Sequence, residues 1–191
     1  MTKTLTVAFA IGAIISTVGC SNDMLWVKAS AAAESPQRVE RGEYLVKIMG
    51  CSDCHTPMKM GPAGPEHDMA RFLSGHPEQV GALPPARLEG PWMMAGAATN
   101  TAFSGPWGVS YAANLTPDQN TGLGIWTEDM FVKAIRLGRH MGTSREILPP
   151  MPWPAFRNAT DEDLASIYTY LRTLKPVVNH VPDVQPAEPI F

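Results

Sequence analysis

The sequence holds 191 residues, 45 % of them apolar and 17 % charged, which predicts one folded domain and excludes a globally disordered chain. Fifteen basic and 18 acidic residues give a formal net charge of −3, which argues against a nucleic-acid partner because nucleic-acid binding needs a basic surface. The three cysteines exclude a framework in which every thiol is paired in a disulfide, so at least one thiol has another use.

The first 19 residues have the pattern of an export signal, with a basic start at Lys3, a short apolar run and small residues behind it. The apolar run is too short and too rich in small residues for a membrane-spanning helix. We favour cleavage before Cys20, because the preceding residues resemble a bacterial lipoprotein box and a lipid would then use the odd thiol. Ordinary cleavage after residues 29–31, or retention of the segment as a helical anchor, stays open. All three alternatives place the folded part outside the cytoplasm, in the periplasm or on the outer side of the cell membrane.

Residues 20–37 are expected to form a flexible tether, followed by the folded domain over 38–178. A helix is predicted over 39–48, because its apolar residues have amphipathic spacing and Gly50 can end it. From residue 56 to residue 124, prolines and glycines recur and no convincing strand alternation is present. Only residues 69–74 have the pattern of a short helical turn. We therefore expect an elaborated loop at about 57–107.

Two further helices are predicted in the second half of the chain. One runs over 127–137, with Thr127 as its N-cap and Gly138 as its stop. The other runs over 160–174, with three acidic residues in its first turn. Residues 179–191 are expected to form an extended, proline-rich tail. The predicted fold class is all-α, with three main helices, long Gly/Pro-rich loops and no strands; so small a helical core needs another group to supply buried surface.

Cys51, Cys54 and His55 form the C-x-x-C-H pattern of covalent haem attachment. Two thiols three residues apart on a helical turn can form thioethers to the two haem vinyl groups. The histidine that follows then lies under the iron as its proximal ligand. A thioredoxin-like redox pair would lack its βαβ context here, and a zinc site would need a second ligand pair. The pattern predicts one covalent haem c, whose two faces the long loops can cover.

The sixth iron ligand decides which chemistry the haem performs, and Met151 is the favoured candidate. It lies between prolines at 149, 150, 152 and 154, which fix the backbone so that a thioether can be held against iron. A His/Met pair raises the reduction potential, as suits an electron carrier, although a gap-filling core methionine is the common alternative. Weaker candidates are Met93, Met94 and Met141, and the expected loop or surface histidines are His67, His76, His140 and His180.

Several short stretches outside the haem motif resemble one known family. They are RGEYL at 41–45, NLTPD at 114–118, TGLGIWT at 121–127, PMPW at 150–153, DEDL at 161–164 and YLR at 170–172. Together they resemble the class I-type cytochrome c domains in the cytochrome subunits of bacterial membrane-bound alcohol, aldehyde and gluconate dehydrogenases. The resemblance covers roughly residues 39–178. It implies that Cys51 and Cys54 carry the haem, with His55 as proximal and Met151 as distal ligand.

The resemblance also implies that Gly42 and Tyr44 lie where the first helix crosses the last, near Tyr168 and Leu171. Those dehydrogenase subunits usually carry two or three haem motifs and this chain carries one, so the partner stays open. The loop at about 57–107 makes the chain longer than a minimal cytochrome domain. We interpret it as a cover over one haem edge that could serve as a docking surface.

The expected function is one-electron transfer by a carrier that is not itself an enzyme. Electrons would arrive from a dehydrogenase or a quinol-oxidising complex and leave to a downstream acceptor such as a terminal oxidase. One alternative is a peroxidase-like haem enzyme or sensor with an open iron, in which His67 or Arg71 would line the distal pocket. Another is a haem subunit permanently bound in a respiratory membrane complex.

Overall fold

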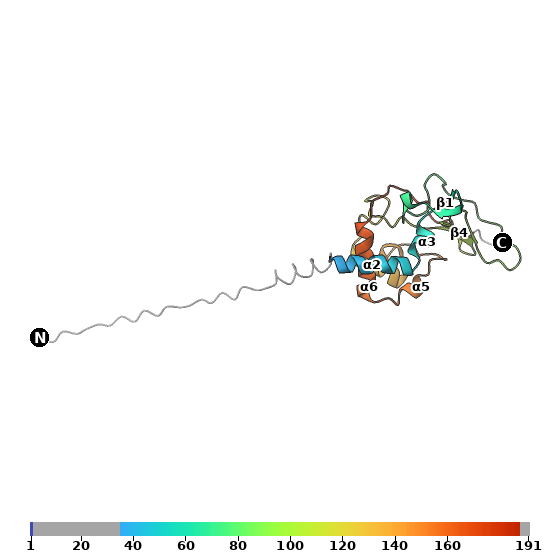
Figure 1. The fold of residues 1–191 in the computed structure, drawn as a ribbon. Helices are drawn as coiled ribbons and strands as arrows, with labels where there is room; N and C mark the ends of the chain where they lie inside the picture. Colours follow the sequence, from blue (N-terminus) through green and yellow to red (C-terminus); the bar gives the residue numbers. More distant parts are fainter. Residues whose placement is uncertain (2–34, 188–191) are drawn as a thin grey trace.

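The computed structural model describes Met1 and residues 35–187. Helices gather at one end of this body, and two small antiparallel sheets lie towards the other (Figure 1). The predicted export signal at 1–19, the predicted lipidation site Cys20 and nearly all of the 20–37 tether fall outside the described residues. Within residues 35–187, no helix is both long enough and apolar enough to cross a membrane.

The helices α2 (Pro36–Ile48) and α6 (Asp161–Thr173) cross closely, as the resemblance predicts (Figure 1). Gly42 is buried at the crossing, where a side chain would collide with the backbone carbonyl of Ser166. A glycine is needed at this position because the backbones of the two helices touch. Tyr44, on the same helix, is 52 % exposed.

The helices predicted in the second half of the chain are present. α4 (Glu128–Leu137) begins at Thr127 and ends at Gly138, and α6 begins at Thr160. Each threonine hydroxyl accepts a hydrogen bond from the N–H of the third residue of its helix. A short helix that was not predicted, α5 (Trp153–Phe156), packs against α4. The buried side chains of the main core are Leu45, Val46, Leu73, Leu123, Phe131, Ile135, Leu164, Ile167 and Leu171.

The all-α prediction is wrong, because the described chain contains two small antiparallel sheets. β1 (Met58–Gly61) pairs with β2 (Gly64–His67). β4 (Ala102–Gly105) pairs on one side with β3 (Ala95–Gly96) and on the other with β5 (Gly108–Tyr111). All five strands lie in or next to the segment that was expected to be an irregular loop.

Two physical properties of these strands explain why the sequence pattern did not predict them. Each is at most four residues long, with glycine or proline near its ends, so its local pattern is that of a loop. β4 and β5 are also buried at nearly every position, so apolar and polar residues do not alternate along them. The helical turn expected over 69–74 is a shorter 3₁₀ turn, Met69–Arg71.

Candidate haem site

The C-x-x-C-H motif forms a short helix of its own, α3 (Cys51–His55). Gly50 precedes it in a left-handed conformation with φ of 67°, which separates α3 from α2. Cys51 and Cys54 are three residues apart on this helix, so their side chains lie on the same face. Both are free thiols and only partly buried. They could therefore form two thioethers to one porphyrin.

The electrostatics of the two thiols disagree with a redox-active cysteine pair. Burial raises the pKa of Cys51 to about 11 and shifts the pKa of Cys54 in the same direction. A thioredoxin-like cysteine needs a lowered pKa instead, because the thiolate is the nucleophile. The zinc interpretation gains no support either: among residues 35–187, no three His, Cys, Asp or Glu side chains lie close enough to hold a metal ion.

The imidazole of His55 is held in the form that a metal ligand needs. Its Nδ1 atom lies 2.7 Å from the carbonyl oxygen of Ala113. A carbonyl can only accept a hydrogen bond, so Nδ1 carries the proton and Nε2 keeps a free lone pair. Burial lowers the pKa of His55, which favours the neutral ring. His55 can therefore present Nε2 to an iron ion.

Residues 73–75, from the predicted loop, donate hydrogen bonds to the backbone and side chain next to and at His55. The N–H of Gly75 donates to the His55 carbonyl at 2.7 Å. The N–H of Leu73 donates to the hydroxyl of Thr56 at 3.0 Å. Neither Gly75 nor Ala113 could be identified as part of the site from the sequence, because both act through backbone atoms that every residue possesses.

Met151 lies at the edge of the main hydrophobic core, in the loop that precedes α5. Cys51 packs against the same core, so one cysteine of the haem motif and Met151 border one hydrophobic cluster. Just before Met151, the Pro149–Pro150 peptide bond is cis. The hydroxyl of Ser110 donates a hydrogen bond to the Pro149 carbonyl at 2.6 Å, which links this loop to β5.

The other ligand candidates are less favourably placed. Met93 and Met94 are 70 % and 42 % exposed in the segment between the two sheets. His76 lies in a loop, as expected, but it is fully buried and not at the surface, and both of its ring nitrogens are engaged in hydrogen bonds. His140 packs edge-on against the indole of Trp126, with the ring centroids 5.0 Å apart.

The buried His76 makes the stability of the fold sensitive to acid. Burial lowers the pKa of His76, whereas the unfolded chain binds this proton near the ordinary value of about 6.5. The stabilising contribution is therefore complete above that pH and is lost as the pH falls below it. We expect thermal unfolding scans to show a smaller acid-induced loss of Tm in His76→Gln than in the wild type. The exposed His180→Gln is the control, and equal losses in all three proteins would contradict the assignment.

The edge of the main core offers a surface that a haem would cover. Several apolar side chains, among them Cys51 of the motif, pack against the core while remaining partly exposed, which leaves apolar area in contact with water. A flat macrocycle attached to α3 would remove part of this area from water. The residues present therefore fit a covalent haem. The partly buried side chains include Met49, Cys51, Leu115, Trp126 and Met151.

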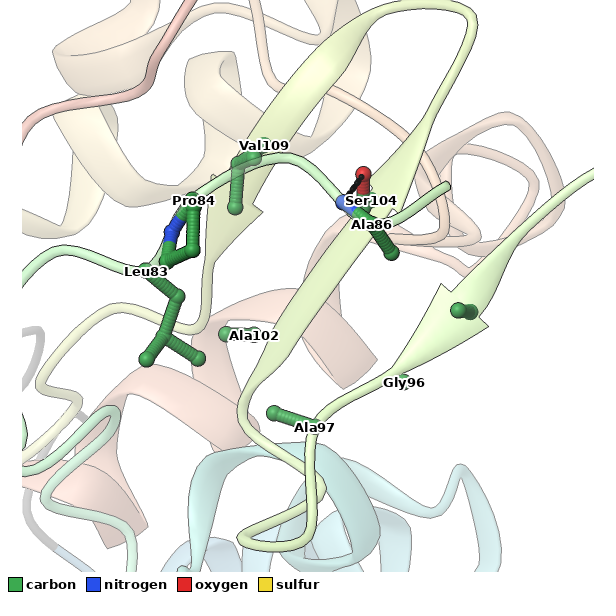
Figure 2. Close-up of a pocket in the computed structure, with 9 residues that line it drawn as sticks. Leu83, Pro84, Ala86, Gly96, Ala97, Ala102, Ser104 and Val109 are labelled. Carbon is green, nitrogen blue, oxygen red and sulfur yellow. Dashed lines mark hydrogen bonds between the residues drawn. The ribbon is translucent and has the colours of Figure 1, made fainter. Parts of the chain in front are cut away.

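A separate hollow of about 110 Å³ lies between residues 83–86 and the sheet of β3, β4 and β5 (Figure 2). Small or apolar side chains such as Leu83 and Val109 line most of it. The hydroxyl of Ser104 is already engaged, because it accepts a hydrogen bond from the N–H of Ala86 at 3.0 Å. None of its described lining residues is titratable, so this hollow adds no chemistry to the candidate site.

Comparison with known proteins finds relatives among curated sequences, although no protein-family model matches the chain. The chain is 31 % identical over 156 residues to the fructose dehydrogenase cytochrome subunit of Gluconobacter japonicus, which covers 81 % of this chain and 25 % of that subunit. It is 30 % identical over 150 residues to the cytochrome c subunit of alcohol dehydrogenase (quinone) of Gluconobacter oxydans, covering 76 % and 24 %. It is 30 % identical over 132 residues to the gluconate 2-dehydrogenase cytochrome c subunit of Pantoea cypripedii, covering 69 % and 22 %. The chain spans about a quarter of the length of these relatives.

The haem-motif helix and these similarities indicate the class: over most of its length the chain resembles c-type cytochromes. Within that class it resembles the cytochrome c subunits of dehydrogenases, so the family resemblance predicted from the short stretches is confirmed. Each of these relatives is named as the cytochrome subunit of its dehydrogenase. This agrees with the expectation of an electron-transfer protein that is not itself the enzyme.

Proposed function

We propose that the chain binds one covalent haem c and transfers single electrons through it. Cys51 and Cys54 would hold the haem as thioethers, His55 would bind the iron through Nε2, and Met151 would bind it on the opposite face. When bound, the haem supplies a reversible one-electron exchange between ferric and ferrous iron. The observation that carries the proposal is the hydrogen bond from His55 Nδ1 to the Ala113 carbonyl, because it fixes the tautomer that a proximal ligand requires.

The protein's contribution would be to hold His55 and Met151, the two residues that would bind the iron, in fixed positions. The Ala113 carbonyl orients the imidazole of His55 and makes the ring a better electron donor. The proline-rich backbone around Met151 restricts the motion of the loop that carries the thioether. If His55 and Met151 both bind the iron, no substrate would need to bind it, and this pair of ligands would raise the reduction potential.

The partners we propose are redox proteins. A dehydrogenase or a quinol-oxidising complex would supply electrons, and a downstream acceptor such as a terminal oxidase would receive them. The names of the relatives support a dehydrogenase as donor. The net charge of −3 favours a partner with a basic face, met through a small and transient contact. We place the protein in the periplasm or on the outer side of the cell membrane, tethered by a lipid on Cys20.

The decisive test is the absorption spectrum of the full chain produced with the cell's haem-attachment machinery. We expect one haem per chain that stays attached through denaturing electrophoresis. The ferric protein should show the weak long-wavelength sulfur-to-iron band, and the ferrous protein should bind carbon monoxide slowly. A haem that acid extraction removes would overturn covalent attachment, and rapid carbon monoxide binding would favour an open-iron enzyme or sensor instead.

A further inference from the structure

The hairpin of β4 and β5 contacts the loop that carries Met151 through a buried side chain. Ser110 lies in β5 and is 7 % exposed. Its hydroxyl donates to the carbonyl of Pro149, two residues before Met151, at 2.6 Å. A second acceptor, the carbonyl of Phe103 in β4, lies at 3.4 Å. Because a hydroxyl has one proton to donate, the shorter bond to the loop dominates.

The loop around Met151 has few backbone donors with which to hold itself in place. Prolines at 149, 150, 152 and 154 have no N–H group. The N–H of Met151 donates to the nearby carbonyl of Leu148 at 3.3 Å, which is a long and local bond. Further back, the N–H of Ile147 donates to the carbonyl of Gly138. The connection of Pro149 to the rest of the fold therefore depends on what its carbonyl accepts.

We propose that Ser110 is a positioning residue that holds the Met151 thioether on the haem iron. This inference rests on the proposed function, in which Met151 is the distal ligand. Without the hydroxyl, the Pro149 carbonyl loses its hydrogen-bond donor and the loop gains freedom to move away from the iron. The time that Met151 spends off the iron then increases. The sheet of β3, β4 and β5, most of which lies within the 57–107 segment, would thus act on the redox site through Ser110.

The matched variants are Ser110→Ala and Ser104→Ala in the full haem-loaded chain. Ser104 lies in β4 and is 8 % exposed, so the same atom is removed from a similarly buried site in the same sheet. Its hydroxyl bonds the Ala86 N–H and makes no contact with the loop of Met151 among the described hydrogen bonds. The rate of carbon monoxide binding to ferrous haem reports how often Met151 leaves the iron. The sulfur-to-iron band of the ferric protein reports the same bond at equilibrium.

We expect Ser110→Ala to bind carbon monoxide about five- to tenfold faster than the wild type, the effect of losing one hydrogen bond. Its sulfur-to-iron band should weaken in parallel. Ser104→Ala and Ser110→Thr, which keeps the hydroxyl, should remain within about twofold of the wild type. Unchanged binding in Ser110→Ala overturns the inference, as does an equal effect in Ser104→Ala. If the wild type itself lacks the band and binds carbon monoxide rapidly, the axial assignment fails and the inference falls with it.

Discussion

Replacing Met151 by alanine is expected to lower the reduction potential of the haem by on the order of 0.2 V, within the range of about 0.8 V that axial ligands span. The thioether stabilises ferrous iron more than water or an empty position does, so its removal favours the ferric state. The open position should also bind carbon monoxide and cyanide rapidly. A potentiometric titration followed by absorption, together with ligand-binding kinetics, measures both effects.

Met93→Ala is the matched control for this experiment. Met93 is 70 % exposed in the segment between the two sheets, so its replacement removes the same side chain without touching the core. We expect its spectrum and potential to match those of the wild type. An unchanged sulfur-to-iron band in Met151→Ala would remove the axial assignment and turn attention to Met94 and Met141.

Replacing Asn179 by alanine is expected to lower the free energy of unfolding by about 3–5 kcal/mol, one of the larger effects that a single substitution can have. The Asn179 side chain is fully buried and its amide nitrogen donates to the carbonyls of Ser74 and His76 at 2.7 and 2.9 Å. Its amide oxygen accepts from the guanidinium of Arg71 and from the N–H of Glu78. Alanine would leave all four partners without this hydrogen bond.

Losing the Asn179 hydrogen bonds should also loosen the backbone at the candidate haem site. Ser74 and His76 flank Gly75, whose N–H donates to the His55 carbonyl. Urea or thermal unfolding of the haem-loaded protein gives the stability, with a Tm lower by about 10 °C as the expected size. Asn158→Ala is the control, since the Asn158 amide also donates to two carbonyls but is exposed. A loss of less than about 1 kcal/mol in Asn179→Ala would show that water replaces the missing amide.

The helices of this protein could be predicted because their signals are local. Thr127 and Thr160 cap α4 and α6 through hydroxyl groups that bond N–H groups three residues further on. The apolar stripes that follow have the period of a helix over about three turns. The strands could not be predicted in the same way, because all of them are at most four residues long and β4 and β5 are buried on both faces. These strands form because another strand is present to pair with them, and the local sequence of one strand does not identify that partner.

The sequence by itself determined that two thiols and an imidazole stand in the C-x-x-C-H spacing, and it predicted Met151 as the thioether that completes the candidate site. Only the tertiary structure decided what holds those groups in place. The Ala113 carbonyl binds His55 across 58 residues of sequence, Ser110 binds Pro149 across 39, and Asn179 binds Ser74 across 105. In each pair the acceptor is a backbone carbonyl, which every residue carries. No residue type marks such a partner in advance, and only the folded chain shows which carbonyl faces which donor.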